Sequence, residues 1–382
     1  MCKSLDWRGF GCYHDKRKCN KWGVAMAGTG YEEDFGRLLA LHANRYPLMQ
    51  PVDWGKLLYQ SCFGPEHLLG EQDEEMVYER LAAEWQGMEP ELVRPGWDWE
   101  PLGGGICRLH LPGAGEFSAA VCRLLVRLFC CSGVGFRPAE EAVVAKRQAK
   151  LAELPGVDRW LREWEQAGRP APSHSQEFRR AYRPHYRLLR RDWAVQFGAM
   201  ARVAKLLAER GAKPCVVVID GHCGSGKTSL AAALAVHLAV QVVHIDDYYL
   251  PVTRRKPDWQ RVCGGNLDRE RFVQEVVQPL REGREIRSRA YDCQRGVLGP
   301  ERVLAAGAPV VIEGSYSMLL TPHELWDLSI FTECGREEQI RRLREREGEY
   351  FAAFEELWLP LEAQYFARYD VKKRCNMTVF LG

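Results

Sequence analysis

The stretch Gly221-His222-Cys223-Gly224-Ser225-Gly226-Lys227-Thr228 decides the fold of the second half of this chain. It fits the phosphate-binding loop pattern G-x-x-x-x-G-K-[ST] at every fixed position. Residues 215–220 before it form an apolar run that predicts a buried strand, and residues 229–235 after it predict the start of a helix. Strand, glycine loop and helix in this order are what the motif requires, because loop amides and the helix N-terminus then face the same phosphate.

The residues of this loop have distinct expected roles. Lys227 is long enough to reach the β- and γ-phosphates of ATP or GTP, and the Thr228 hydroxyl is a ligand for Mg²⁺. A glycine-rich turn with a chance lysine is the alternative, and both flanking segments argue against it. The expected nucleotide-binding residues are Gly221, His222, Cys223, Gly224, Ser225, Gly226, Lys227, Thr228 and Ser229.

The overall composition narrows the classes of protein to which the chain can belong. A chain of 382 residues predicts two domains. The net charge of +2, from 53 basic and 51 acidic residues, gives no argument for a nucleic-acid or membrane partner. No uninterrupted apolar run is long enough to span a bilayer. The 14 cysteines include no C-x-x-C pair, so we interpret them as reduced thiols of a cytoplasmic protein.

The chain divides into three segments. Residues 1–30 show no period and are expected to be a disordered tail, with Met26 as an alternative start to Met1. The spacing of Cys2, Cys12, His14 and Cys19 in this tail matches no common zinc pattern. Residues 31–194 are expected to be a mostly helical domain of unknown function, and residues 195–382 a second domain. Helical spacing of apolar residues occurs at 32–44, 76–85, 117–130, 139–168 with an interruption at Pro155, and 193–210.

Short apolar strands alternate with helices in the second domain. The alternation predicts an α/β fold with a five-stranded, parallel, doubly wound sheet. Ligands bind such sheets at the carboxyl ends of the strands. The expected strands are 215–220, 241–245, 309–313, 327–332 and 377–381.

Charged side chains follow two of these strands. Asp246 and Asp247 come after the second strand, and adjacent carboxylates are costly to bury without a cation such as Mg²⁺. One of them could also accept a proton from an attacking hydroxyl, although a solvated turn is the alternative. Glu313 follows the third strand, where it could hold Mg²⁺ or its waters.

Taken in order, these motifs resemble the uridine kinase and phosphoribulokinase family of phosphate-loop kinases over residues 216–381. Besides the loop, the resemblance rests on family motifs in this order: D-x-[FY]-[FY] at Asp246-Asp247-Tyr248-Tyr249, N-x-D at Asn266-Leu267-Asp268, Y-D at Tyr291-Asp292, E-G at Glu313-Gly314, D-x-x-[IV]-F at Asp327-Leu328-Ser329-Ile330-Phe331, and lid arginines at Arg342 and Arg346.

The resemblance implies a role for each matched residue. Asp246 would be the base that deprotonates the acceptor hydroxyl, while Lys227, Arg342 and Arg346 would stabilise charge on the transferring phosphoryl group. Thr228 and Glu313 would hold Mg²⁺. The acceptor would be bound by Asp247, Tyr249, Asn266, Asp268 and Tyr291. For the arginines alone, a solvated helix face is the alternative.

The chain departs from the family pattern in the lid. Gln339 and Leu343 stand where the family has arginines, and a distinctive segment at 358–366 follows in place of the usual lid ending. The basic residues Arg254, Arg255, Lys256 and Arg261 near the expected acceptor site could grip an anionic substrate, with a solvated loop as an equal alternative.

The first domain implies no activity. Residues 107–111 look like a strand, and residues 179–187 interleave aromatic side chains with arginines. That pattern is compatible with RNA or phosphate contact, although a helix surface with interdomain salt bridges is the commoner explanation. His67, His110 and His174 lack ligand spacing and stay unassigned.

The sequence therefore predicts a Mg²⁺-dependent kinase that transfers the γ-phosphoryl group of ATP or GTP to a hydroxyl of a nucleoside or related ribosyl metabolite. The alternatives are a kinase for another small metabolite, including a phosphorylated one, and a nucleotide-dependent switch or binding module. The oligomeric state and the identity of the acceptor are left open.

Overall fold

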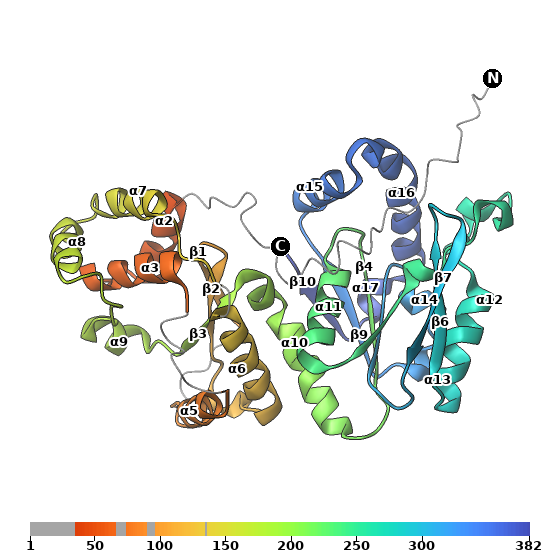
Figure 1. Cartoon of the computed structure of the whole chain (residues 1–382), viewed down its shortest axis with the longest axis horizontal. Coiled ribbons are helices and arrows are strands. Elements are labelled where there is room, and N and C mark those ends of the chain that lie inside the picture. The colour runs from red at the N-terminus through yellow and green to blue at the C-terminus, as the bar shows by residue number, and fades with distance from the viewer. Residues whose placement is uncertain (1–34, 66–73, 90–95, 134–135) are drawn as a thin grey trace. The chain divides into compact units, whose positions relative to one another are not determined.

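The computed structural model describes residues 35–65, 74–89, 96–133 and 136–382 (Figure 1). The expected tail and His67 lie outside these described residues. The described residues fall into two compact units, one within 26–201 and one within 202–382, and helix α10 (Arg191–Arg210) contains the boundary between them. Within the described ranges, no helix is long and apolar enough to cross a membrane.

The C-terminal unit is built on a five-stranded parallel sheet, as predicted, and the strands lie in the order β10-β9-β4-β8-β5. The strand before the phosphate loop, β4, is central and lies between β8 and β9. Helix α11, which follows the loop, packs against this sheet. The strands are β4 (Val216–Gly221), β5 (Gln241–His244), β8 (Val310–Glu313), β9 (Leu328–Glu333) and β10 (Met377–Phe380).

The helices of this unit lie in the connections between strands. Those with α-helical geometry are α11 (Lys227–Leu238), α12 (Arg269–Phe272), α13 (Gln278–Glu282), α14 (Ser317–Leu320), α15 (Arg336–Glu347), α16 (Phe351–Tyr369) and α17 (Val371–Arg374). A π-helical turn, Val273–Val277, joins α12 to α13.

A two-stranded antiparallel hairpin was not predicted. It consists of β6 (Ile286–Asp292) and β7 (Val297–Leu304). Most side chains of β7 are exposed, so the sequence carries no alternation between an apolar and a polar face at this point.

The N-terminal unit combines helices with a small antiparallel sheet in the order β1-β2-β3. The prediction of helices is confirmed, and the strand expected at 107–111 is β2 (Ile106–His110). The other two strands, β1 (Trp99–Gly103) and β3 (Tyr186–Arg190), were not predicted. The helices are α2 (Phe35–Arg45), α3 (Pro51–Phe63), α5 (Glu74–Gln86), α6 (Ala119–Gly133), α7 (Glu141–Leu151), α8 (Val157–Gln166) and α9 (Gln176–Tyr182).

The arginine-rich stretch at 179–187 contains the end of α9 and the start of β3. The chain turns between them at Arg183, which has a φ of 42°. Arg183 pairs with Glu89 and Arg187 with Glu84, so these arginines form ion pairs inside their own unit.

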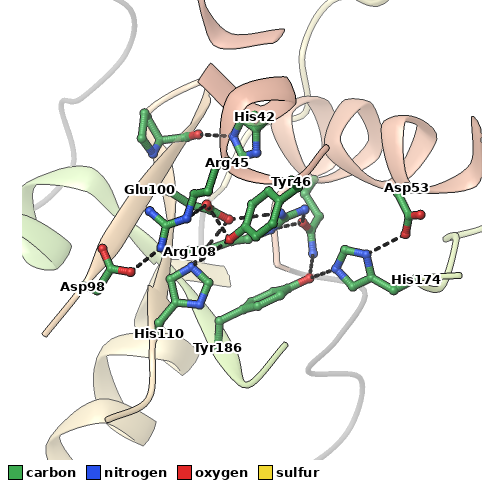
Figure 2. Close-up of polar contacts among 12 residues, drawn as sticks. His42, Arg45, Tyr46, Asp53, Asp98, Glu100, Arg108, His110, His174 and Tyr186 are labelled. Atoms are coloured by element: carbon green, nitrogen blue, oxygen red, sulfur yellow. Dashed lines mark hydrogen bonds and ion pairs between the residues drawn. The ribbon is translucent and has the colours of Figure 1, made fainter. Parts of the chain in front are cut away.

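A buried polar network lies between the small sheet and helices α2 and α3 (Figure 2). Its centre is Arg108 of β2, which has no exposed surface. The Arg108 guanidinium donates to Oε1 of Gln60 at 2.9 and 2.7 Å and to Oε1 of Glu100 at 3.1 Å. The hydroxyl of Tyr46 donates to the other Glu100 oxygen at 2.8 Å. A buried ion pair offsets its desolvation cost only when such further hydrogen bonds are made.

A second arm of the network links Asp53, His174 and Tyr186. His174 Nδ1 lies 2.9 Å from Asp53 Oδ1, and His174 Nε2 lies 2.8 Å from the Tyr186 hydroxyl. The Tyr186 ring also contacts His110, with a centroid distance of 5.8 Å. Two of the three histidines left unassigned by the sequence therefore meet at one tyrosine. The network joins α2, α3, the sheet and the segment before α9, so it ties the N-terminal unit together.

Two histidines in this network favour the neutral state. Burial lowers the pKa of His42 and of His174 from 6.5 to about 4. Burial opposes ionisation of Asp53 as well, but hydrogen bonds from His174 and Ser175 hold its pKa below the usual value. Between pH 6.5 and about 4 the unfolded chain binds protons that the folded unit does not.

We therefore expect the N-terminal unit to lose stability as the pH falls from 7 to 5, by about 2 kcal/mol for each of these histidines. Calorimetric unfolding of the full chain at both pH values measures the loss, and His174→Asn identifies the transition of this unit and should reduce its pH dependence. His323→Asn, at an exposed position in the other unit, is the matched control. An unchanged pH dependence in His174→Asn would contradict the expectation.

Candidate functional site

The phosphate loop, residues 221–228, has a backbone that only glycine can adopt at two positions. Gly221 has a φ of 143° and Gly226 a φ of 102°. A Cβ atom at Gly221 would lie 2.2 Å from the carbonyl oxygen of Thr332 in β9, and one at Gly226 would lie 2.9 Å from Leu381. These glycines are required both for the backbone conformation and for the close approach of neighbouring chain.

Lys227 opens helix α11 and turns its side chain back into the loop. Its ammonium donates to the carbonyl oxygens of Gly221 at 2.7 Å and His222 at 2.9 Å, and lies 3.3 Å from Ser315 Oγ. The side chain is buried. The Lys227 ammonium is therefore fixed at the N-terminus of a helix. The helix N-terminus also attracts anions, so both features favour a negatively charged ligand here.

Thr228 and Glu313, the two residues expected to hold Mg²⁺, lie together. The Thr228 hydroxyl lies 3.2 and 3.3 Å from the two carboxylate oxygens of Glu313, which is buried at the end of β8. His244, to which the sequence analysis gave no role, places Nδ1 2.5 Å from Glu313 Oε1.

The donor chemistry of this pair fits Mg²⁺. A hydroxyl and a carboxylate are hard oxygen ligands, and Mg²⁺ usually takes one or two of these from the protein and the rest from phosphate and water. Across the described part of the chain, no cluster of three or more His, Cys, Asp or Glu side chains suited to a metal occurs. A metal bound here would therefore depend on the nucleotide phosphates for other ligands.

The two adjacent aspartates point to different partners. Asp247 is buried, and its carboxylate accepts from Arg302 Nη1 of β7 at 3.2 Å. Asp246 is only partly buried and accepts from the Tyr249 hydroxyl at 3.0 Å. The carboxylate of Asp247 is thus held by an ion pair with the hairpin, whereas that of Asp246 is half-buried and bonds to Tyr249.

An aromatic group lies beside Asp246. The ring of Tyr249 is 6.1 Å from that of Trp358 in α16, and Trp358 is 6.0 Å from Trp259. The Arg255 guanidinium lies over Trp259 at 5.0 Å and donates to the carbonyl oxygen of Leu250. These three rings form a surface suited to a flat, partly apolar molecule.

The other expected acceptor residues have mainly structural contacts. Asp268 caps helix α12 and pairs with Arg254 at 3.0 Å. Asn266 is buried and its carbonyl oxygen accepts from the Leu250 amide. Tyr291 lies in β6 opposite Leu298 of the hairpin.

The lid arginines lie in α15 and have partners of their own. Arg342 donates to the carbonyl oxygens of Gly224 at 3.2 Å and Leu381 at 2.8 Å, so it reaches the phosphate loop. Arg346 pairs with Glu347 at 2.6 Å. Gln339, where the family has an arginine, donates to the Cys223 carbonyl oxygen at 2.9 Å and so supports the loop as a neutral residue.

Helix α16 contributes contacts that the sequence analysis missed. Both carboxylate oxygens of Glu362 lie 2.9 Å from the Cys223 amide nitrogen, and the Ser315 hydroxyl donates to Oε1. The Tyr365 hydroxyl donates to Asp220 at 2.7 Å. The available signal was a carboxylate, Glu362, at helical spacing with Trp358 and Tyr365 on the buried face of a helix.

Comparisons with known proteins find similar solved structures. No protein-family model matches the chain. The C-terminal half resembles solved P-loop kinase structures. One, described as a "Possible Uridine Kinase" from Bacillus stearothermophilus, is 22% identical, covers 46% of this chain and 92% of its own, and has a TM-score of 0.35. A D-glycerate 3-kinase from Cryptococcus neoformans is 15% identical, covers 46% of this chain and 87% of its own, and has a TM-score of 0.34. At these identities the similarity describes the fold alone.

Proposed function

We propose that residues 195–382 form a Mg²⁺-dependent kinase domain that transfers the γ-phosphoryl group of ATP or GTP to a hydroxyl of a small molecule. One observation carries the proposal: the phosphate loop, the Thr228–Glu313 pair and Asp246 gather at one edge of the sheet. Strand pairing sets Glu313 beside Ile219 and His244, and Asp246 follows His244 by two residues. This edge is where the carboxyl ends of parallel strands bind ligands.

Each group has a role in the proposed transfer. The loop amides and Lys227 would hold the phosphates, and Thr228 with Glu313 would hold Mg²⁺, which supplies charge neutralisation when bound. Asp246 would take the proton from the acceptor hydroxyl as that oxygen attacks the γ-phosphorus. The hydrogen bond from Tyr249 would fix the orientation of the Asp246 carboxylate.

A nucleoside or related ribosyl compound is the acceptor class that the surroundings of Asp246 favour. Tyr249, Trp259 and Trp358 offer rings for a flat base to contact. Two of the four basic residues near this site have internal partners, since Arg254 pairs with Asp268 and Arg255 lies over Trp259. The other two, Lys256 and Arg261, are exposed. The preference for a ring-bearing acceptor over a sugar phosphate therefore rests on the three rings beside Asp246.

A cytoplasmic location agrees with this function, because ATP is the expected donor and the cysteines of the described segments are free thiols. The N-terminal unit receives no catalytic role in this proposal. A nucleotide-dependent switch would need no base at position 246, so a rate of ADP release that depends on the acceptor separates the two functions.

The direct test is ADP release by the full chain with ATP and Mg²⁺ against a panel of nucleosides, vitamins and sugar phosphates. We expect release to be much faster with one nucleoside or ribosyl compound than with water alone. Release that is equally slow with every compound would instead support the switch.

Lys227→Ala should lower phosphoryl transfer by about 10²-fold or more, because the ammonium meets charge that grows on the transferring group. The fold should survive, since the side chain bonds only to loop oxygens and Ser315. Steady-state rates and circular dichroism measure the two effects. Near-normal turnover would mean that the nucleotide site is elsewhere.

Asp246→Asn should lower acceptor phosphorylation by about 10²–10⁴-fold while ATP affinity changes little, because the loop amides, Lys227 and Thr228 remain. The matched control is Asp247→Asn. It makes the same change of size and charge as Asp246→Asn, but at the carboxylate that pairs with Arg302. Initial rates and calorimetric ATP binding distinguish them. A larger loss of rate in Asp247→Asn would assign the base to the neighbouring residue.

A further inference from the structure

The side chain of Glu362 in α16 lies against the phosphate loop. Its two oxygens lie 2.9 Å from the Cys223 amide nitrogen, Ser315 donates to it, and His222 Nδ1 lies 3.6 Å away. The residue is only 5% exposed. We propose that the Glu362 carboxylate takes the place of the terminal phosphate in the nucleotide-free kinase and is displaced when ATP binds. This inference rests on the proposed function.

The contacts of Glu362 place it at the γ-phosphate end of the loop. Ser315 donates to Glu362 and lies 3.3 Å from Lys227 Nζ, so carboxylate and ammonium share one hydroxyl. In phosphate loops this lysine reaches the β- and γ-phosphates. The donors that surround the carboxylate, an amide N–H, a hydroxyl and a nearby ammonium, are those that bind phosphate oxygens.

The carboxylate remains ionised in this position. Burial alone would raise the pKa of Glu362, but the nearby His222 ring and the charge of Lys227 hold that pKa below its usual value. A charged carboxylate and a γ-phosphate at the same donors would repel each other strongly in a poorly solvated site. Binding of a nucleoside triphosphate therefore requires Glu362 to leave.

The rest of α16 can stay in place while the side chain moves. Tyr365 is bonded to buried Asp220, and the Phe366 ring packs on His222 with a centroid distance of 4.5 Å. These contacts hold the helix against the end of β4, so rotation of one side chain frees the Cys223 amide. ATP binding thus includes the cost of breaking the contacts of Glu362, and ATP affinity is lowered accordingly.

Glu362→Gln in the full chain tests this competition. We expect the calorimetric dissociation constant for Mg²⁺–ATP, measured without acceptor, to fall by about tenfold, which corresponds to removal of one charged competitor. The gain should be smaller for ADP, whose β-phosphate only approaches the carboxylate, and absent for AMP, which carries neither a β- nor a γ-phosphate. Glu356→Gln is the control, since it removes the same charge from an exposed position of the same helix. It should leave all three affinities unchanged.

Glu362→Ala should change ATP affinity in the same direction, because it removes the carboxylate without supplying a new hydrogen-bonding group. Unchanged or weaker ATP binding in both variants would overturn the inference and assign Glu362 to positioning the loop. Equal gains for ATP, ADP and AMP would also overturn it, since the effect would not concern the terminal phosphate. If neither variant folds, the carboxylate is needed for the fold and cannot be a displaceable group. If wild type and variants all fail to bind ATP, the proposed function itself falls.

Discussion

The close approach of the phosphate loop to β9 is the constraint on which the C-terminal unit depends. The Thr332 carbonyl oxygen leaves no room for a Cβ atom at position 221, which is therefore glycine. Ser225 Oγ also lies 2.6 Å from Thr332 Oγ1. With the loop fixed between its own strand and β9, the carbonyl oxygens that hold Lys227 are fixed too. The positions of the Lys227 ammonium and of the Cys223 amide therefore depend on the close packing of the loop against β9.

The sequence predicted the parallel sheet well because its signal is local. Each strand of that sheet is a short apolar run next to a helix, and β4 and β8 are buried along their whole length. The hairpin β6–β7 and strand β3 were missed for the opposite reason. Strand β7 exposes most of its side chains, and β3 begins in a run of arginines and aromatics whose partners are Glu84 and the small sheet. Only tertiary contacts distinguish such segments from a helix surface.

Some residues of the candidate site could likewise be predicted from the sequence, and others could not. The loop, Asp246 and Glu313 could be predicted from the sequence because a motif or a strand end marks each of them. The different environments of Asp246 and Asp247 could not be predicted, since they depend on Arg302 from the hairpin. The contact between Glu362 and the loop joins residues 139 positions apart. A distinctive sequence at 358–366 showed that this helix is unusual, but only the fold shows that it lies on the loop.

The two units use buried charge in opposite ways. In the N-terminal unit Arg108 donates to Glu100 and to Gln60, and Asp53 accepts from His174, so charges are matched by side chains of the same network. Such matching stabilises one conformation. In the C-terminal unit the Lys227 ammonium donates to neutral oxygens of the loop backbone and Ser315. The nearby carboxylate of Glu362 accepts hydrogen bonds from the Cys223 amide and the Ser315 hydroxyl. A buried cation held by neutral oxygens gains more from an incoming anion than one already in an ion pair, because its desolvation is only partly offset. The same desolvation cost that favours one fixed conformation in the first network would, in the proposed function, favour phosphate binding at the second.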